Sequence, residues 1–242
     1  MAKKGGGRHL KRYAAPRAVK LPRKSYTWTT KAAAGPHPLE RAIPLRTFVR
    51  DYLSFARNAK EADHAISSGE ILVDGVVRRD SKFPVGFMDV IRVPAFNRAF
   101  RILLDHRGRP VPKAVEGDDS VKLCKVVKKQ IARGGKVQLT FHDGKNISGD
   151  FAKIKPGDVI KLSLPDLKVV EHLQMEVGML ALVTGGKNTS KVGRIEEIKL
   201  IAGTQPNLVI LRSGGESFQA PEHYIFVVGK ESPVISLERG AA

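Results

Sequence analysis

Between residues 43 and 69 the apolar positions recur with the period of an α-helix. In "IPLRTFVRDYLSFA" the spacing is i, i+3, i+4, i+7 and i+8, which predicts a helix with one stripe facing a core. The stripe consists of Leu45, Phe48, Val49, Tyr52 and Leu53. A second helix is predicted in "NAKEADHAISSG", with Asn58 as its N-cap and Glu61 three residues later. Gly69 is expected to end that helix in the left-handed conformation.

After these helices the pattern alternates as it does in β-strands. The stretch "EILVDGVVRRD" predicts a hairpin that turns at Asp74 and Gly75, and residues 89–93 predict a further strand. Two helices and a hairpin, with a row of arginines, make residues 43–94 a candidate domain.

Beyond Pro94 short apolar runs alternate with glycine-containing turns, a pattern typical of small β-barrels. Only Ser120–Ala132 favours a helix there. The expected strands are Phe100–Leu104, Lys136–Phe141, Asp158–Leu164, Met179–Thr184, Val192–Glu197, Asn207–Leu211 and Tyr224–Val228. The predicted fold class is therefore α+β, mostly β.

Charge changes this picture at the N-terminus. The chain has 42 Lys and Arg against 24 Asp and Glu, and ten of the basic residues but no acidic ones precede Glu40. Prolines and glycines disfavour regular structure there, so we expect a basic arm that becomes ordered only on a partner. Tyr13, Tyr26 and Trp28 lie between the charges, where rings can stack on unpaired bases and cations can meet phosphates. The alternative is a soluble, disordered tail.

Other classes of protein fit the sequence poorly. No apolar run approaches the ~20 residues of a membrane-spanning helix, and no apolar segment follows the basic N-terminus as it would in a secretory signal. We therefore expect no membrane partner. Cys124 is the only cysteine, so the chain cannot form an internal disulfide, which fits a reducing cytosol. We expect the Cys124 side chain to be buried as a small apolar residue.

The loop "LVTGGKNTSKVG" resembles a nucleotide-binding loop but fails as one. When Gly186 and Lys187 are aligned with the phosphate-loop motif, Ala181 stands where the first glycine should be and Asn188 where the magnesium-binding hydroxyl should be. The following residues alternate like a strand, whereas a phosphate loop opens a helix. The glycines and lysines fit a phosphate-binding hairpin tip or an ordinary solvated loop equally well.

No other constellation of residues supports catalysis. The seven histidines show no chelating pair, and one cysteine cannot build a zinc framework. We expect no catalytic residues, no metal, no cofactor and no small-molecule substrate.

A family resemblance then appears over essentially the whole chain. "GMLALVTGGKNTSKVGRIEEI" resembles the KOW motif of ribosomal and elongation proteins, with Gly193 at its characteristic glycine. "PLRTFVRDY", "ISSGEILVDGVVRRD" and "VGFMDVIRV" resemble the S-four RNA-binding module. In this order, and with "HLKRYAAPRAVKLPRK", "GPHPL", "KLCKV" and "IFVVGKESPVISLERG", the chain resembles the archaeal and eukaryotic small-subunit ribosomal protein family S-four-e. The short end after "ISLERG" favours an archaeal member.

The resemblance implies a structural protein of the small ribosomal subunit, located in the cytoplasm within the ribosome. Its partners would be small-subunit ribosomal RNA and neighbouring small-subunit ribosomal proteins. The implied parts are a basic N-terminal extension (1–42), an S-four-like RNA-binding domain (43–94), a β-rich central domain (95–172) and a KOW domain with an SH3-like barrel (173–242). The expected RNA-binding residues are Arg8, Lys11, Arg12, Arg17, Lys20, Arg23, Lys24, Trp28, Lys31, Arg46, Arg50, Arg57, Arg78, Arg79, Lys82, Lys187, Asn188, Lys191 and Arg194.

Two alternatives remain. RNA-modifying enzymes such as pseudouridine synthases carry the same module, but "FRILLDHRG" lacks the arginine directly before the leucine and aspartate of their motif. A transcription or translation factor could use a KOW motif, although the basic arm and the whole-length resemblance argue against it.

Overall fold

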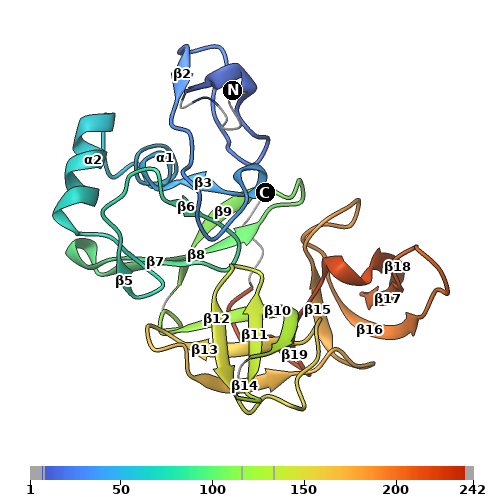
Figure 1. The fold of residues 1–242 in the computed structure, drawn as a ribbon. Coiled ribbons are helices and arrows are strands. Elements are labelled where there is room, and N and C mark those ends of the chain that lie inside the picture. The colour runs from blue at the N-terminus through green and yellow to red at the C-terminus, as the bar shows by residue number, and fades with distance from the viewer. Residues whose placement is uncertain (1–6, 8, 116, 133, 238–242) are drawn as a thin grey trace, which may run out of the picture. The chain divides into compact units, whose positions relative to one another are not determined.

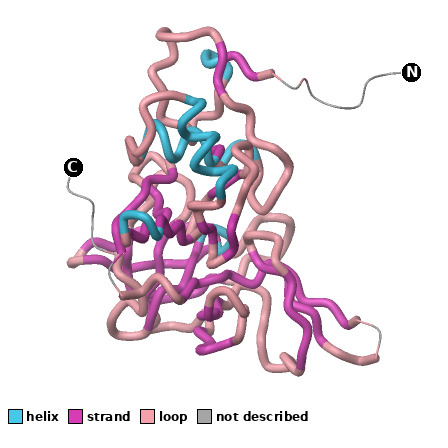
Figure 2. Tube along the Cα trace, turned by 90° about the vertical axis from the view of Figure 1, so that its left-hand side faces the viewer, coloured by secondary structure: helices cyan, strands magenta, loops and turns pink. Residues whose placement is uncertain are grey.

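The computed structural model describes residues 7, 9–115, 117–132 and 134–237. The chain divides into two compact units: Met1–Leu103 with Arg109–Pro112, and Leu104–Gly108 with Lys113–Ala242. Strands dominate the regular structure, and the α-helices belong to the first unit (Figures 1 and 2). No helix among the described residues is both long and apolar enough to cross a membrane.

The N-terminal segment of the first unit has short elements joined by loops. β1 (Leu10–Lys11) pairs with β2 (Trp28–Thr29), and the 3₁₀ turns are η1 (Arg12–Ala14) and η2 (Leu39–Arg41). Ala18 and Val19 are buried, and the backbone N–H of Lys20 donates to the hydroxyl of Tyr52 at 2.7 Å. The expectation that this segment orders only on a partner is corrected here. Proline and glycine interrupt helices and strands, but they do not prevent small apolar side chains from packing against the same unit.

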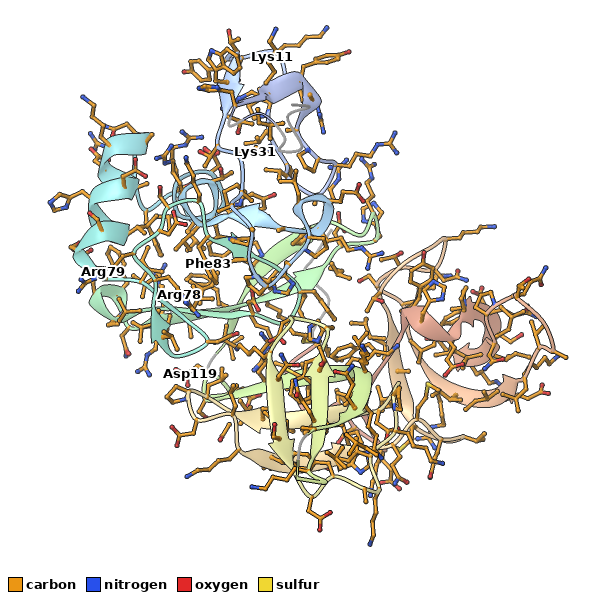
Figure 3. The ribbon with its side chains drawn as sticks, viewed as in Figure 1. Lys11, Lys31, Arg78, Arg79, Phe83 and Asp119 are labelled. Atoms are coloured by element: carbon orange, nitrogen blue, oxygen red, sulfur yellow. The ribbon has the colours of Figure 1, made fainter. Side chains whose placement is uncertain are left out.

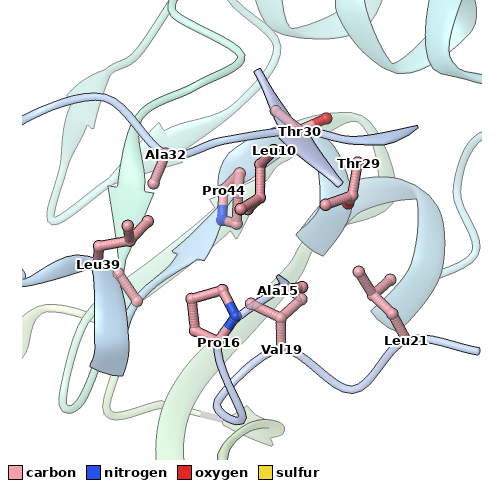
Figure 4. A pocket seen from close by; sticks show the side chains of 11 residues that line it. Leu10, Ala15, Pro16, Val19, Leu21, Thr29, Thr30, Ala32, Leu39 and Pro44 are labelled. Carbon is pink, nitrogen blue, oxygen red and sulfur yellow. The ribbon is translucent and has the colours of Figure 1, made fainter. Parts of the chain in front are cut away.

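A small, partly open apolar hollow of about 10 Å³, room for about one water molecule, lies between this segment and Pro44 (Figure 4). Apolar side chains from three separate stretches line it. They include Leu10, Val19, Leu21, Leu39 and Pro44.

The first predicted helix, at residues 45–53, is only partly α-helical, because its second half is a π-helical turn of larger radius. α1 (Leu45–Thr47) passes directly into a π-helical turn, η3 (Phe48–Tyr52), and Ser54 has a positive φ of 54°. The predicted stripe still faces the core: Leu45, Phe48 and Val49 are buried, and Tyr52 and Leu53 pack against them.

The second helix agrees with the sequence prediction. α2 (Ala59–Ser68) begins after Asn58, whose side-chain oxygen accepts from the N–H of Glu61 at 2.9 Å. It ends at Gly69, which has φ 88° and donates to the carbonyls of Ala65 and Ile66. These caps satisfy backbone groups that the helix leaves without partners.

The sheets of the first unit follow these helices. β3 (Ile43–Pro44) pairs with β6 (Pro84–Val85), and a five-stranded sheet has the order β5-β4-β7-β8-β9. Its strands are β4 (Leu72–Val73), β5 (Val76–Val77), β7 (Val90–Val93), β8 (Arg98–Leu104) and β9 (Pro110–Val115), with a 3₁₀ turn η4 (Pro94–Phe96) after β7. Asp74 (φ 51°) and Gly75 (φ 77°) form the predicted turn, since both central positions of this hairpin need positive φ. The unit boundary crosses β8 and β9.

The second unit begins with an antiparallel sheet in the order β12-β11-β10-β13-β14 (Figure 1). The strands are β10 (Val121–Ile131), β11 (Val137–Phe141), β12 (Asn146–Gly149), β13 (Val159–Ser163) and β14 (Val169–Leu173). The predicted helix Ser120–Ala132 is wrong, because this stretch is the long strand β10. Three consecutive buried positions, Lys122 to Cys124, and a bulge between Val126 and Lys128 hide the two-residue alternation of a strand. Cys124 is buried, as expected.

The remaining sheet has the order β18-β17-β16-β15-β19. Its strands are β15 (Leu180–Val183), β16 (Val192–Lys199), β17 (Leu208–Ser213), β18 (Glu216–Pro221) and β19 (Ile225–Gly229), with a 3₁₀ turn η5 (Glu222–Tyr224) before β19. All pairings are antiparallel. The sequence analysis predicts no strand at β9, β12, β14 or β18; β12 and β18 have few apolar residues, and prolines interrupt β9.

Lys125 ties β10 to the turn that precedes β19. Its Nζ donates to the backbone carbonyls of Glu222 (3.2 Å), His223 (3.1 Å) and Ile225 (2.6 Å). Burial lowers the pKa of the Lys125 ammonium to about 8, against the opposing effect of the Glu222 carboxylate.

Lys125→Met is expected to destabilise the protein at pH 7 by about 1–3 kcal/mol, because three backbone carbonyls lose the donor that the Lys125 Nζ supplies. Between the folded pKa near 8 and the unfolded value of 10.5, the unfolded chain binds more protons. Wild-type stability relative to the variant should therefore increase from pH 8 to pH 10. Denaturant unfolding of both proteins measures this difference. Lys128→Met, at a neighbouring exposed position, is the control and should change neither quantity; a variant as stable as wild type with no pH dependence would contradict the role of Lys125.

Candidate nucleic-acid interface

The N-terminal segment exposes three aromatic rings beside cations. Tyr13, Tyr26 and Trp28 are 75%, 73% and 56% exposed. The Lys11 Nζ lies 6.0 Å from the centroid of the Trp28 ring, and the Arg12 guanidinium carbon lies 5.1 Å from that of Tyr26. Exposed rings with adjacent positive charge suit the stacking of unpaired bases whose phosphates are close by.

Two arginines of this segment are directed inward. Arg12 is buried, and its Nη1 donates to the Ser25 hydroxyl at 2.7 Å and to the Pro22 carbonyl at 3.2 Å. Nη1 of Arg23 donates to the carbonyls of Tyr13 and Ala15, both at 2.8 Å. Both residues are among the expected RNA contacts, and in the folded chain their hydrogen bonds hold the loops in place.

The other predicted cations of the segment are placed differently. The Lys31 Nζ donates to the Gly7 carbonyl at 2.6 Å, whereas the side chains of Lys11, Arg17, Lys20 and Lys24 are exposed (Figure 3 labels Lys11 and Lys31). Arg8 lies outside the described residues.

Two arginines of residues 43–94 are paired with carboxylates. Arg46 makes a two-pronged contact with Asp63, at 2.5 and 2.7 Å. Arg50 contacts Asp51 through two bonds of 2.7 Å, and this carboxylate raises the pKa of the Arg50 guanidinium. Arg57 is exposed. Pairing neutralises much of the long-range field of Arg46 and Arg50, so their attraction for phosphate is weaker than the sequence suggests.

The connection after β5 presents a second group of cations. The Arg78 guanidinium carbon lies 4.6 Å from the centroid of the Phe83 ring, and its buried Nε has no hydrogen-bond partner among the described residues. Arg79 and Lys82 are exposed. Figure 3 labels Arg78, Arg79 and Phe83. Stacking on the Phe83 ring fixes the plane of the half-buried Arg78 guanidinium, and such an orientation suits contact with a phosphate.

The glycine-rich loop connects two strands, β15 and β16, which confirms the expected strand after it and leaves no helix to hold a nucleotide. The Thr189 hydroxyl donates to the Gly186 carbonyl at 2.6 Å, and a Cβ on Gly185 would meet the Tyr224 ring at 2.6 Å. A Cβ on Gly193 would lie 2.9 Å from the backbone oxygen of Arg212, so close strand packing requires glycine there.

This packing presents most of the predicted loop residues to solvent. Lys187, Lys191 and Arg194 are exposed, and Lys191 Nζ lies 5.3 Å from the centroid of the Phe218 ring. Asn188 is half-buried, with its side-chain amide donating to the Gln219 carbonyl at 3.2 Å. Asn188 therefore shapes the loop, while the three cations remain available to an anion.

Metal-binding groups are not concentrated in these surfaces. Taken one unit at a time, the described residues bring no three His, Cys, Asp or Glu ligand atoms within 4.8 Å of one another.

Three family models match successive parts of the chain. The RS4NT domain matches residues 4–40, the S4 domain residues 44–91, and the model described as ribosomal family S4e residues 96–169.

Curated relatives match over the whole chain. The small ribosomal subunit protein eS4 of Archaeoglobus fulgidus is 47% identical, with 95% of this chain and 97% of that protein covered. The protein of the same name from Methanosphaera stadtmanae is 44% identical, with 98% of each covered. The crystal structure of the 30S ribosomal protein S4e from Thermoplasma acidophilum superposes with a TM-score of 0.69 at 33% identity, covering 79% of this chain and 96% of that one.

Proposed function

Because the chain belongs to the ribosomal S4e family, that of the small ribosomal subunit proteins eS4, we propose that it is a structural protein of the small ribosomal subunit that binds ribosomal RNA. The observation that carries this proposal is identity of 44% over 98% of the chain to a small ribosomal subunit protein eS4. The match of residues 44–91 to the S4 domain supports the RNA-binding role.

The finer assignments are part of the same proposal. The basic extension spans residues 1–42, the S-four-like domain 43–94, the β-rich central domain 95–172 and the KOW domain with its SH3-like barrel 173–242. The close packing around Gly193 supports the KOW assignment. The protein works as a scaffold rather than an enzyme, within cytoplasmic ribosomes of an archaeal type, and contacts neighbouring small-subunit proteins as well as RNA.

Most of the proposed contact set is chosen by exposure and free charge, and the half-buried Arg78 is added because its guanidinium is stacked on the Phe83 ring. Arg12, Arg23 and Asn188 support the loops, and Arg46 and Arg50 contribute weakly through their paired guanidinium groups. The cations proposed to meet phosphates are Lys11, Arg17, Lys20, Lys24, Arg57, Arg78, Arg79, Lys82, Lys187, Lys191 and Arg194. Lys31 and Arg8 remain in the set, and Trp28 is proposed to stack on a base.

Co-sedimentation tests this function. The protein is expected to remain with small subunits, at one copy each, through a moderate-salt wash. Release at low salt with recovery on RNA polymerase or messenger RNA would favour a KOW-type factor instead. Pseudouridine formed in rRNA by the purified protein would favour a modifying enzyme.

A further inference from the structure

A second acid-free run lies in the central domain. Residues 120–142 contain six Lys and Arg and no Asp or Glu. In the structure this run includes β10 and β11, which pair antiparallel, and β12 pairs with the other edge of β11; we call these three strands the ribbon. None of its basic residues belongs to the proposed contact set.

The strand register sorts the side chains of this ribbon onto two faces. Lys129 pairs with Leu139, and Leu139 with Ile147, on the face that holds the buried core. Lys128 pairs with Thr140, Gln130 with Gln138, and Gln138 with Ser148, on the opposite face. Strand alternation adds Lys136 to this second face. We call it the ribbon face: Lys128, Gln130, Lys136, Gln138, Thr140 and Ser148.

The basic residues of the run have different environments. Lys122 is buried with Asp143 at 2.9 Å, and Lys125 is held by three carbonyls. The Lys129 Nζ donates to the carbonyls of Ala152 (2.7 Å) and Ile154 (2.9 Å), which fixes the ribbon to the following loop. Lys128 and Lys136 are exposed, and no carboxylate among the described residues lies within ion-pair distance of either. The ribbon is thus anchored on its inner face and carries free charge on its outer face.

The composition of the ribbon face favours nucleic acid over protein. Protein interfaces concentrate aromatic side chains and are depleted of lysine, whereas this face has amides, hydroxyls and two free lysines. Single-stranded RNA is held largely by stacking on aromatic rings, and the aromatic side chain of these strands, Phe141, is buried. Double-stranded RNA presents a wide, shallow minor groove with 2′-hydroxyls, bordered by phosphates. Side-chain amides and hydroxyls can form hydrogen bonds with the 2′-hydroxyls, and lysines can pair with the phosphates. The exposed Asp150, directly after β12, marks an edge of the face that would lie away from phosphate.

We propose that the ribbon face is a further RNA-binding surface, which lies across the minor groove of a double-stranded segment of small-subunit rRNA. This inference rests on the proposed function and adds the central domain to the surfaces that hold the RNA.

Directed cleavage tests the position of this surface. Because Cys124 is buried, Gln130→Cys provides the reactive thiol for an iron chelate in the full-length protein bound to the organism's own small-subunit rRNA. We expect cuts on both strands of one helix, offset across its minor groove. Lys168→Cys, at an exposed position on another strand connection, is the control and should not cut that helix.

Charge reversal tests its energetics. A plot of log affinity against log salt concentration has a slope that grows by roughly 0.7–0.9 for each phosphate contact. The double variant Lys128→Glu/Lys136→Glu removes two such contacts and should therefore reduce the slope by roughly 1.4–1.8. Lys168→Glu/Lys230→Glu makes the same change in net charge and should leave the slope unchanged. Three results would overturn the inference. The Gln130→Cys protein could bind rRNA with wild-type affinity and give no cuts, or its cuts could be confined to single-stranded loops. The two double variants could also show equal salt slopes. Failure of the wild-type protein to bind rRNA would instead reject the proposed function.

Discussion

Replacing the four outward-facing cations of the N-terminal segment with glutamine is expected to weaken binding to small-subunit rRNA by about two to three orders of magnitude near 0.1 M salt. The reason is that each lost phosphate contact reduces the slope of log affinity against log salt concentration by roughly 0.7–0.9. The changes are Lys11→Gln, Arg17→Gln, Lys20→Gln and Lys24→Gln in one chain. Filter binding at several salt concentrations should show a slope about 3 smaller than that of the wild type.

Substitution is a sharper test than deletion of the segment. Ala15, Ala18 and Val19 are buried, so deletion would expose apolar surface of the first unit and confuse unfolding with lost contacts. Arg12→Gln is the informative control. It removes internal hydrogen bonds and should lower thermal stability, while the salt slope stays nearly unchanged. A quadruple variant with the wild-type slope would show that these cations do not meet phosphates.

Reversing two charges of the β15–β16 loop, Lys187→Glu/Lys191→Glu, is expected to weaken rRNA binding at least tenfold and to lower the salt slope by roughly 1.4–1.8. Both side chains are exposed, and the loop is held by contacts of Thr189 and the Tyr224 ring rather than by the lysines. The fold should therefore persist, with at most about 1 kcal/mol lost from the contact of Lys191 with Phe218.

The matched control keeps the charge. Lys187→Arg/Lys191→Arg should bind rRNA as the wild type does, because guanidinium groups also pair with phosphate. ATP binding should be absent from all three proteins, since the loop opens a strand rather than a helix. Equal rRNA affinity of the reversed variant and the wild type would remove this loop from the interface.

Local chemistry explains which elements were predictable. The Asn58 cap, the Gly69 stop and the Asp74–Gly75 turn depend on a few adjacent residues, and each was predicted correctly. β10 was mistaken for a helix because a bulge and a run of three buried positions replace simple alternation. Its length and pairing are set by β11 and β13, which no local pattern in β10 reveals.

In the candidate interface too, features set by adjacent residues could be predicted from the sequence, whereas features set by distant residues could not. The count of charges makes the N-terminal segment and the glycine-rich loop candidates for the interface, but it does not distinguish free cations from those that are hydrogen-bonded within the fold. Arg46 is 17 residues from its partner Asp63, and Arg12 is 13 from Ser25, so both partners depend on the folded chain. A helix at residues 120–132 would not place Lys128 and Lys136 on one face, so only the strand register reveals the ribbon face.

Crosslinking of purified small ribosomal subunits, with the joined peptides and nucleotides sequenced, tests the central claim most directly. We predict one copy of the protein per subunit and crosslinks to small-subunit rRNA from residues 9–31, from residues 57–82 and from the loop 187–194. Crosslinks only to messenger RNA or nascent transcripts, with the protein absent from washed subunits, would contradict it.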